Sequence, residues 1–450
     1  MKGIKVPILI AGSVLLILTI AAITLAVVLL IRNNNERELN RLRAAGVPTL
    51  TPASQGGIVT DIPEAIPRPD FNEAIDGVIT EADEALPLPP VRINLKSIQG
   101  LQRVDFNPQI GDVFNLHFDQ DSGNLFLATV EPDQTRSIWR LSADLNIERV
   151  LSSDSQTGEI FLQADSRGVL YAGFANPGVL WRSEDLGDSW RLVADQIDGA
   201  FWALADDGRG TLWGALHAYN KALIYRSTDW GKTWQGWKDF HEVYPEYAVP
   251  YRAGDDRFSL RHLHSVAFYN NTLFVGVGDV TRFTVASQDK GETWQPIWSE
   301  GFTAGVPLKD RSGLLLGPDR LQTHGIALYD FASGKTTEVW SPIPYGYAGY
   351  TYSLLEMDGV YYAAFHTETN EVKEFSGKSG IIVSPDGYKW YPFLEFDPLT
   401  NWARTDIFMT AGKQVNSAIS LNGYITLNGA LYLFEPPIGR WFEVHSAFGE

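Results

Sequence analysis

The histidines at positions 262 and 264 are the side chains whose types and spacing most directly suggest chemistry. His262 and His264 flank Leu263, so in a β-strand both imidazoles would point to the same face. Two imidazole nitrogens can begin a metal site, and Asp255 or Asp256 could supply a third ligand. The pair alone defines no ligand set, because buried histidines also serve as hydrogen-bonding groups. The sequence therefore assigns no metal and predicts no cofactor.

His262 ends an unusually long segment, residues 239–262, which we expect to form part of a binding surface. Long connections inside compact folds are often functional, and this one mixes aromatic rings, arginines and paired carboxylates. Aromatic residues near 350 and 402 would add to the same face. The alternatives are a solvated, ion-paired loop and aromatic rings that pack between sheets. The candidate ligand-binding residues are Tyr251, Arg252, Asp255, Asp256, Arg257, His262, His264, Tyr347, Tyr350, Trp402 and Arg404.

Four copies of the turn pattern S-x-D-x-G-x-[ST]-W, the last of them shortened, indicate the elements that must position these residues. The Asp carboxylate and the hydroxyls can accept hydrogen bonds from N–H groups of their own turn, and Gly tolerates a positive φ. The Trp that follows would begin the next strand and bury its ring. We therefore interpret these residues as structural rather than catalytic. They are Ser183, Asp185, Gly187 and Trp190; Ser227, Asp229, Gly231 and Trp234; Ser287, Asp289, Gly291 and Trp294; and Ser384, Asp386, Gly387 and Trp390.

This pattern resembles the Asp-box, or BNR (sialidase-like) repeat, of β-propellers. The resemblance implies that each box lies between the third and fourth strands of a blade, away from the face where ligands bind. The first Ser residues are 44, 60 and 97 positions apart, and the last interval suits two units near the four-stranded blade period. We predict an all-β propeller with seven four-stranded blades, and six blades is the alternative. The expected blades are 114–151, 158–195, 199–240, 261–298, 301–340, 349–396 and 415–445.

The N-terminal part of the chain reads as a membrane anchor followed by a stalk. A short basic tail, 1–6, precedes an uncharged stretch, 7–31, which as a helix would extend about 37 Å and cross a bilayer. Residues 32–91 are Pro-rich and predict a partly disordered spacer, and 92–450 form the propeller. We expect a single-pass protein of the cell membrane with the propeller outside the cytoplasm. The arginines that follow the apolar stretch favour the opposite orientation, which stays an alternative.

Composition and the resemblance together leave two classes of function. The chain has no cysteine and a net charge of −18, which excludes thiolate chemistry and makes nucleic acid an unsuitable ligand. The first class is a non-catalytic binding, adhesion or assembly module for a protein or a glycan. The second is a glycoside hydrolase, sialidase-like or glucanase-like, because such boxes also occur in those enzymes.

A sialidase resemblance implies an arginine clamp, a Tyr nucleophile paired with Glu, and an Asp acid/base. No motif identifies the clamp in this chain, so no catalytic residue is assigned and we favour the binding module. The arginines considered for the clamp are Arg252, Arg257, Arg261, Arg282, Arg320 and Arg404.

Overall fold

The computed structural model describes most of the region predicted to form the propeller. The described residues are 92–98, 101–107, 110–142, 146–153, 159–175, 178–218, 220–251, 258–319, 324–343, 350–357, 359–366, 379–396, 407–411, 423–427 and 430–434. All of them belong to one compact unit, Pro69–Glu450. The predicted tail, membrane helix and stalk lie outside the described residues. Within the part of the chain that is described, no helix has the length and apolar character needed to span a membrane.

Six antiparallel sheets of four strands follow one another along the chain. They are β3 (Asp112–Asp119), β4 (Asn124–Val130), β5 (Arg136–Leu141) and β6 (Ile147–Ser153); β7 (Ile160–Ala164), β8 (Leu170–Phe174), β9 (Gly178–Ser183) and β10 (Arg191–Ile197); β11 (Ala200–Asp206), β12 (Leu212–His217), β13 (Leu223–Ser227) and β14 (Gln235–Asp239); β15 (Leu263–Tyr269), β16 (Thr272–Val277), β17 (Phe283–Ser287) and β18 (Gln295–Trp298); β19 (Phe302–Pro307), β20 (Gly313–Pro318), β21 (Ala327–Asp330) and β22 (Lys335–Glu338); and β23 (Tyr350–Met357), β24 (Val360–His366), β25 (Ser379–Ser384) and β26 (Tyr391–Phe396). The prediction of an all-β propeller with four-stranded blades is confirmed.

A further sheet has five strands and combines both ends of the described chain, in the order β1-β2-β29-β28-β27. Its strands are β1 (Arg92–Ile98), β2 (Leu101–Asn107), β27 (Ile407–Ala411), β28 (Gly423–Leu427) and β29 (Ala430–Phe434). β2 pairs with β29, with Gln102 opposite Leu433. The prediction of a seventh four-stranded blade at 415–445 is therefore wrong in its composition, because strands from the N-terminal side complete this sheet.

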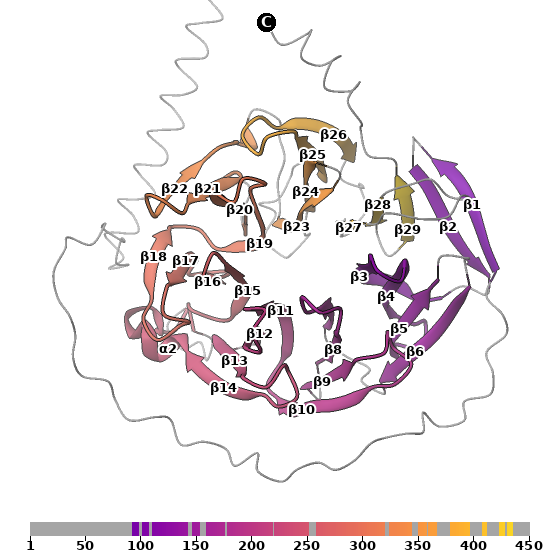
Figure 1. Ribbon diagram of the computed structural model, residues 1–450, viewed down its shortest axis with the longest axis horizontal. Coiled ribbons are helices and arrows are strands. Elements are labelled where there is room, and N and C mark those ends of the chain that lie inside the picture. Colours follow the sequence, from indigo (N-terminus) through magenta and orange to yellow (C-terminus); the bar gives the residue numbers. More distant parts are fainter. Residues whose placement is uncertain are drawn as a thin grey trace, which may run out of the picture. The chain divides into compact units, whose positions relative to one another are not determined.

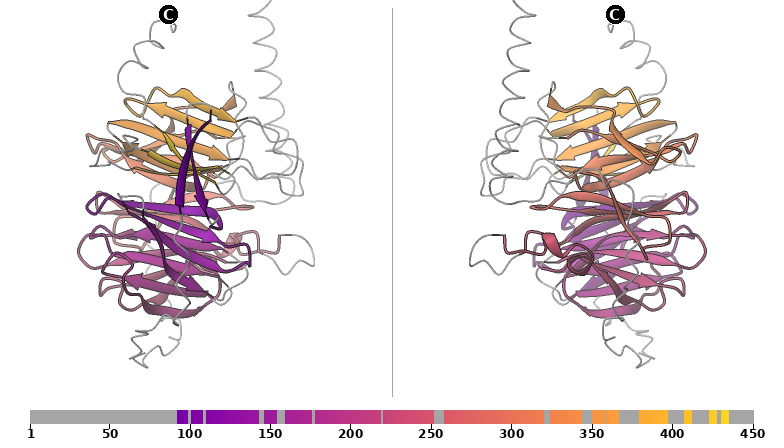
Figure 2. Two further views of the ribbon diagram at one scale, coloured as in Figure 1. Left: turned by 90° about the vertical axis from the view of Figure 1, so that its right-hand side faces the viewer. Right: turned by 90° about the vertical axis from the view of Figure 1, so that its left-hand side faces the viewer.

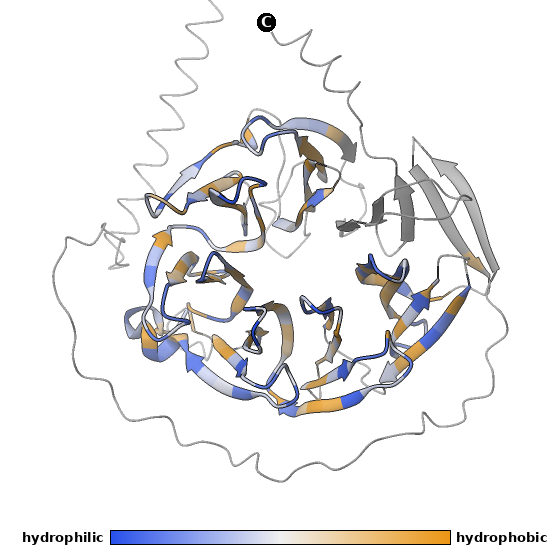
Figure 3. Cartoon of the chain, viewed as in Figure 1, coloured by the Kyte–Doolittle hydropathy of each residue, from blue (hydrophilic) through white to orange (hydrophobic). Residues whose placement is uncertain are grey.

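The sheets form a closed ring, because the first strand of each sheet contacts the first strand of the next (Figure 1). This series runs through β3, β7, β11, β15, β19, β23 and β27 and returns to β3. The second strands are the most buried: every residue of β8, β16 and β20 is buried. The outermost strands β10 and β14 mix half-buried and exposed positions, and Figure 3 shows hydrophilic residues along them. The apolar core thus lies between the faces of neighbouring sheets.

The four box turns connect third and fourth strands, and in each the Ser hydroxyl oxygen accepts from the Gly N–H while the Asp carboxylate accepts from an N–H later in the turn. In the second box, Ser227 Oγ accepts from the N–H of Gly231 at 2.8 Å and Asp229 Oδ1 accepts from the N–H of Thr233 at 3.0 Å. The glycine φ values are +91°, +72°, +92° and +80° at Gly187, Gly231, Gly291 and Gly387. Trp190, Trp234 and Trp390 are buried, and Trp294 is half-buried. The box side chains therefore shape the turns and pack between blades.

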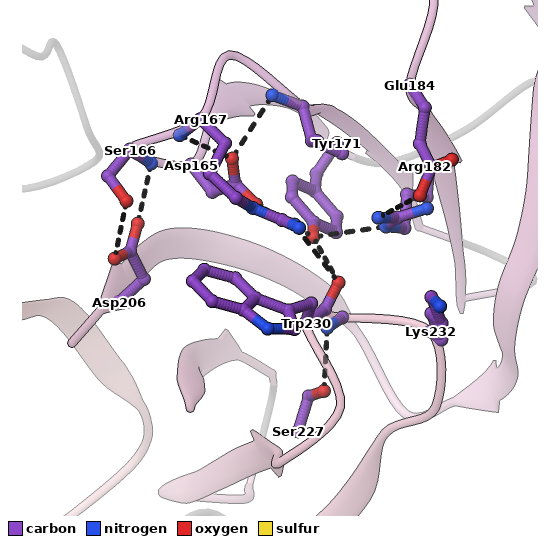
Figure 4. A network of polar contacts seen from close by, with 12 residues as sticks. Asp165, Ser166, Arg167, Tyr171, Arg182, Glu184, Asp206, Ser227, Trp230 and Lys232 are labelled. Carbon is purple, nitrogen blue, oxygen red and sulfur yellow. Dashed lines mark hydrogen bonds and ion pairs between the residues drawn. The ribbon is translucent and has the colours of Figure 1, made fainter. Parts of the chain in front are cut away.

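A polar network ties the second box to the preceding blade (Figure 4). Tyr171 of β8 donates its hydroxyl to the carbonyl of Trp230 at 3.2 Å, and the Arg167 guanidinium lies 3.9 Å from the centre of the Trp230 ring. Arg182 Nε donates to the Tyr171 oxygen at 3.3 Å. Burial raises the pKa of Tyr171 to about 12, so its hydroxyl keeps its proton at neutral pH. One box turn is thus bonded to a strand of another sheet.

Antiparallel pairing gives the ring two faces. The box face carries the turns between third and fourth strands. The site face carries the starts of first and third strands and the ends of second and fourth strands, so it also carries the connection from β14 to β15. This connection contains α2 (Phe240–Val243) and the 3-10 helix η1 (Pro245–Tyr247), and Figure 2 shows it projecting beyond the strand ends.

Candidate functional site

Two buried imidazoles meet on the site face where β15 begins. His262 and His264 are 2% and 3% exposed, and their Nε2 atoms are 2.9 Å apart. His262 Nδ1 lies 3.0 Å from the carbonyl oxygen of Ala218, and His264 Nδ1 lies 2.7 Å from Asp319 Oδ1. Carbonyl and carboxylate oxygens only accept hydrogen bonds, so each Nδ1 donates. The Nε2 atoms of both rings are therefore the atoms that converge.

Asp279 lies against both Nε2 atoms from the end of the neighbouring strand β16. Its Oδ2 is 3.1 Å from His262 Nε2 and 2.7 Å from Arg261 Nη1, and its Oδ1 is 3.6 Å from His264 Nε2. Its backbone N–H donates to Asp319 Oδ2 at 3.1 Å, which holds it at a φ of 69°. Burial alone would raise the pKa of Asp279. The close contact with His262 and the nearby His264 and Arg261 instead hold this pKa well below its usual range.

Close packing behind the imidazoles depends on Gly278. A Cβ atom at this position would lie 2.3 Å from the Nδ1 and Cε1 atoms of His264. Only glycine leaves room for the ring at that distance from the backbone. The Gly278-Asp279 pair therefore both makes space for His264 and places a carboxylate beside it.

A third imidazole, His217 at the end of β12, completes the cluster. Its ring centre is 3.9 Å from that of His262, and its Nδ1 contacts the carboxylate of Glu159 at 2.8 Å. Trp202 stacks on the His217 ring with centres 4.6 Å apart. One ligand-type atom from each of His217, His262 and His264 lies within 4.8 Å of the others. The three rings come from two neighbouring blades.

Burial sets the charge state of His262 and shifts the pKa of a nearby carboxyl group. Burial lowers the pKa of His262 to about 4, with nearby His217 and His264 adding to the effect, so this ring is neutral at pH 7. Glu300, just before β19, is also buried, and burial raises its pKa to about 7 although Arg282 Nε lies 2.9 Å from its Oε1. The site face therefore combines the neutral imidazole of His262 with carboxylates in a poorly solvated setting.

The structure describes only some of the residues predicted to bind a ligand. Tyr251 is 37% exposed on the connection between β14 and β15, and Tyr350 is half-buried at the start of β23. His262 and His264 converge as the alternation predicted. Arg252, Asp255, Asp256, Arg257, Tyr347, Trp402 and Arg404 lie outside the described residues.

Two arginines considered for a sialidase-type clamp are occupied by carboxylates of the protein itself. Arg261 binds Asp279 and Arg282 binds Glu300. Arg252, Arg257, Arg320 and Arg404 lie outside the described residues. Asp279, Asp319 and His217 were not singled out in the sequence. The signal that could have found Asp279 and Asp319 is an Asp within two residues of the end of the second strand in two consecutive blades.

An exposed apolar patch lies beside the cluster on the same face. It consists of Val249, Tyr251 and Val280, which are 47%, 37% and 37% exposed. Their segments are joined through Ser259, whose N–H donates to the carbonyl of Val249 at 2.8 Å and whose carbonyl accepts from Thr281 at 3.1 Å. Val280 directly follows Asp279, so the apolar patch borders the cluster.

The connection from β14 to β15, which carries Val249 and Tyr251, packs against the propeller core. Phe240, Tyr247 and Leu260 are buried in one core cluster with residues of β15–β17. His241 Nε2 contacts the carbonyl oxygen of Leu260 at 2.6 Å, and the N–H of Phe258 donates to Asn220 Oδ1 at 3.0 Å. The patch is therefore held in place by packing on both sides of the segment.

No family model matches this chain, and no curated protein matches it by sequence. Solved structures of similar fold do exist, and they are β-propellers. The extracellular domain of the hybrid two-component system BT4673 from B. thetaiotaomicron is 12% identical with a TM-score of 0.49, over 75% of this chain and 40% of that one. Virginiamycin B lyase from Staphylococcus aureus is 12% identical with a TM-score of 0.48, over 76% and 99%. YCF48 bound to a D1 peptide is 14% identical with a TM-score of 0.45, over 77% and 100%. The likeness is confined to the fold.

Proposed function

We propose that this protein is a non-catalytic binding module that presents the site face of its propeller to a protein partner. Residues 7–31 would anchor it in the cell membrane, and the stalk 32–91 would hold the propeller outside the cytoplasm. The observation that carries the proposal is the apolar patch, in which Val249 and Tyr251 lie on a packed connection and Val280 lies on the neighbouring turn between β16 and β17.

The chemistry of the patch favours a protein over a glycan. Aliphatic side chains gain from contact with an apolar surface, and aromatic residues such as Tyr are enriched where proteins meet. A glycan would instead be recognised by several stacked rings with polar groups around them. Preorganisation also lowers the ordering cost of binding, since the described residues of the connection are already held by packing and hydrogen bonds.

A site-specific photo-crosslinking experiment on the full chain in its native membrane tests this proposal. The photoreactive residue p-benzoylphenylalanine replaces either Tyr251 on the site face or Tyr388 on the box face, which is 50% exposed and serves as the matched control. We expect one protein adduct of defined mass from position 251 and none from position 388. The adduct should disappear when Val249→Asp and Val280→Asp are added.

Two outcomes would contradict the proposal. Equal adducts from both faces would mean that no face is specialised for a partner. Turnover of fluorogenic glycosides by the purified full chain, lost on substitution of site-face residues, would instead establish the glycoside hydrolase that the sequence left as the alternative.

A further inference from the structure

The imidazole cluster beside the apolar patch has the composition and the spacing of a metal site. His262 Nε2, His264 Nε2 and the Asp279 carboxylate lie at mutual distances of 2.9, 3.1 and 3.6 Å. Ligand bonds of about 2.0–2.1 Å place neighbouring ligand atoms about 2.9 Å apart in an octahedron and about 3.3 Å apart in a tetrahedron. The observed separations span both values, so one ion can reach all three groups with small side-chain shifts.

The second shell of the cluster also suits a metal. Ligating histidines almost always donate their other ring N–H to a carboxylate or a carbonyl, which fixes the tautomer. His217, His262 and His264 each have such a partner at Nδ1, namely Glu159, Ala218 and Asp319 in that order. The Nε2 atoms of His262 and His264, which are 2.9 Å apart, would then both face a bound ion, and His217 would offer its remaining ring nitrogen. Packing of three histidines does not by itself require that each Nδ1 has an oxygen partner.

Charge and accessibility complete the case. The carboxylates of Glu159, Asp279 and Asp319 supply three negative charges around the imidazoles, Arg261 offsets one, and a divalent cation would balance the remaining two. His217 and Asp279 are each about a quarter exposed at their side chains, at 22% and 25%, so an ion can enter from the site face. The chain has no cysteine, and a donor set of imidazoles with one carboxylate suits Zn²⁺ and its first-row neighbours rather than Mg²⁺ or Ca²⁺.

We propose that His217, His262, His264 and Asp279 bind one divalent first-row transition metal, for which Zn²⁺ is the probe of choice. The ligands come from two neighbouring blades, β11–β14 and β15–β18. Their second-shell carboxylates, Glu159 and Asp319, precede β7 and follow β20 in the blades on either side. The ion would thus connect four consecutive blades next to the apolar patch. It would lie on the face that we propose to bind a protein partner, but the metal proposal does not depend on that partner.

Metal titration of the full chain in detergent tests the proposal. After removal of metals with a chelator, Zn²⁺ is added and the bound metal is counted by mass spectrometry. We expect one Zn²⁺ per chain, lost in His262→Gln and in His217→Ala. Asp319→Asn, which alters only the second shell, should weaken affinity roughly 10–100-fold. His324→Ala is the matched control, because His324 lies on the same face near Glu300 and Glu338 but outside the cluster.

A second measurement needs no variant and so does not depend on the folding of mutants. X-ray absorption of the zinc-loaded natural chain should show imidazole nitrogens as the main ligands with one carboxylate oxygen. Failure of the natural chain to bind Zn²⁺ or Co²⁺ stoichiometrically would overturn the proposal and leave a cluster held by shared protons. Equal binding by His262→Gln, or a preference for Mg²⁺, would also overturn it. Partner crosslinking from position 251 is scored separately, so either proposal can fail alone.

Discussion

Replacement of Gly231 by alanine would measure how firmly the box turns join neighbouring blades. A Cβ atom at Gly231 would lie 2.1 Å from the hydroxyl of Tyr171, which is fully buried. The φ of +72° costs an L-residue about 1–2 kcal/mol. Displacing the packed ring adds about 1–3 kcal/mol, and loss of the hydrogen bond from Tyr171 to Trp230 adds about 1 kcal/mol. We therefore expect Gly231→Ala to lower the free energy of unfolding by about 3–6 kcal/mol.

Gly208→Ala is the matched control, because Gly208 has a φ of +65° and no atom within 4 Å of the added Cβ. It should lose only the conformational term of about 1–2 kcal/mol. Urea unfolding of the full chain in detergent, followed by tryptophan fluorescence, compares the two variants. Equal losses would refute the reasoning, since they would show that the Tyr171 ring moves aside without cost. Combining Gly231→Ala with Tyr171→Phe should cost less than the two single losses together.

Two further predictions concern the site face. Glu300→Gln removes a carboxyl whose pKa is raised from 4.5 to about 7 by burial; the folded state holds the proton more tightly, so natural stability falls as pH rises from about 4.5 through 7. Relative to the natural chain, the free energy of unfolding of the variant should therefore rise by up to about 3 kcal/mol between pH 4.5 and 7, with no further rise above pH 7. Denaturant unfolding measured from pH 4 to 9 checks this, and a difference in stability that does not change with pH would contradict it. Gly278→Ala should displace His264, which would abolish Zn²⁺ binding and lower the free energy of unfolding by about 1–3 kcal/mol. Gly305→Ala is the control, because its Cβ would meet neighbours at 3.5–3.6 Å. This control should retain both Zn²⁺ binding and stability.

Four of the six complete blades could be predicted from the sequence because each carries a box, and a box is a local feature. Each box makes its hydrogen bonds within its own turn, so the pattern locates the end of a third strand and the start of a fourth. The unit at β19–β22 has lost the box, yet its turn retains Gly334 at a φ of 66°. The closing sheet could not be predicted in the same way, because β1 and β2 carry no box and pair with strands from the far end of the chain.

Only those residues of the candidate site that are close together in the sequence could be predicted from it. Alternation along a strand places His262 and His264 on one face from sequence alone. Asp319 contacts His264 across 55 positions, and Ala218 contacts His262 across 44. Such partners depend on which strand ends are neighbours on the ring, and this follows from the blade order rather than from any motif. Asp255 and Asp256, the ligands first considered, lie outside the described residues, and Asp279 is the carboxylate found at the imidazoles.

The closing sheet has a consequence for the time course of synthesis. Gln102 of β2 pairs with Leu433 of β29, 331 positions later (433 minus 102). At about 5–20 residues per second, a ribosome needs roughly 15–65 s to make that distance. Throughout this interval β2 is bonded to β1 on one edge, and the opposite edge has no strand to pair with. An unpaired strand edge invites association with other chains, so the nascent protein needs a chaperone or early blade stacking to shield β2 until β29 arrives.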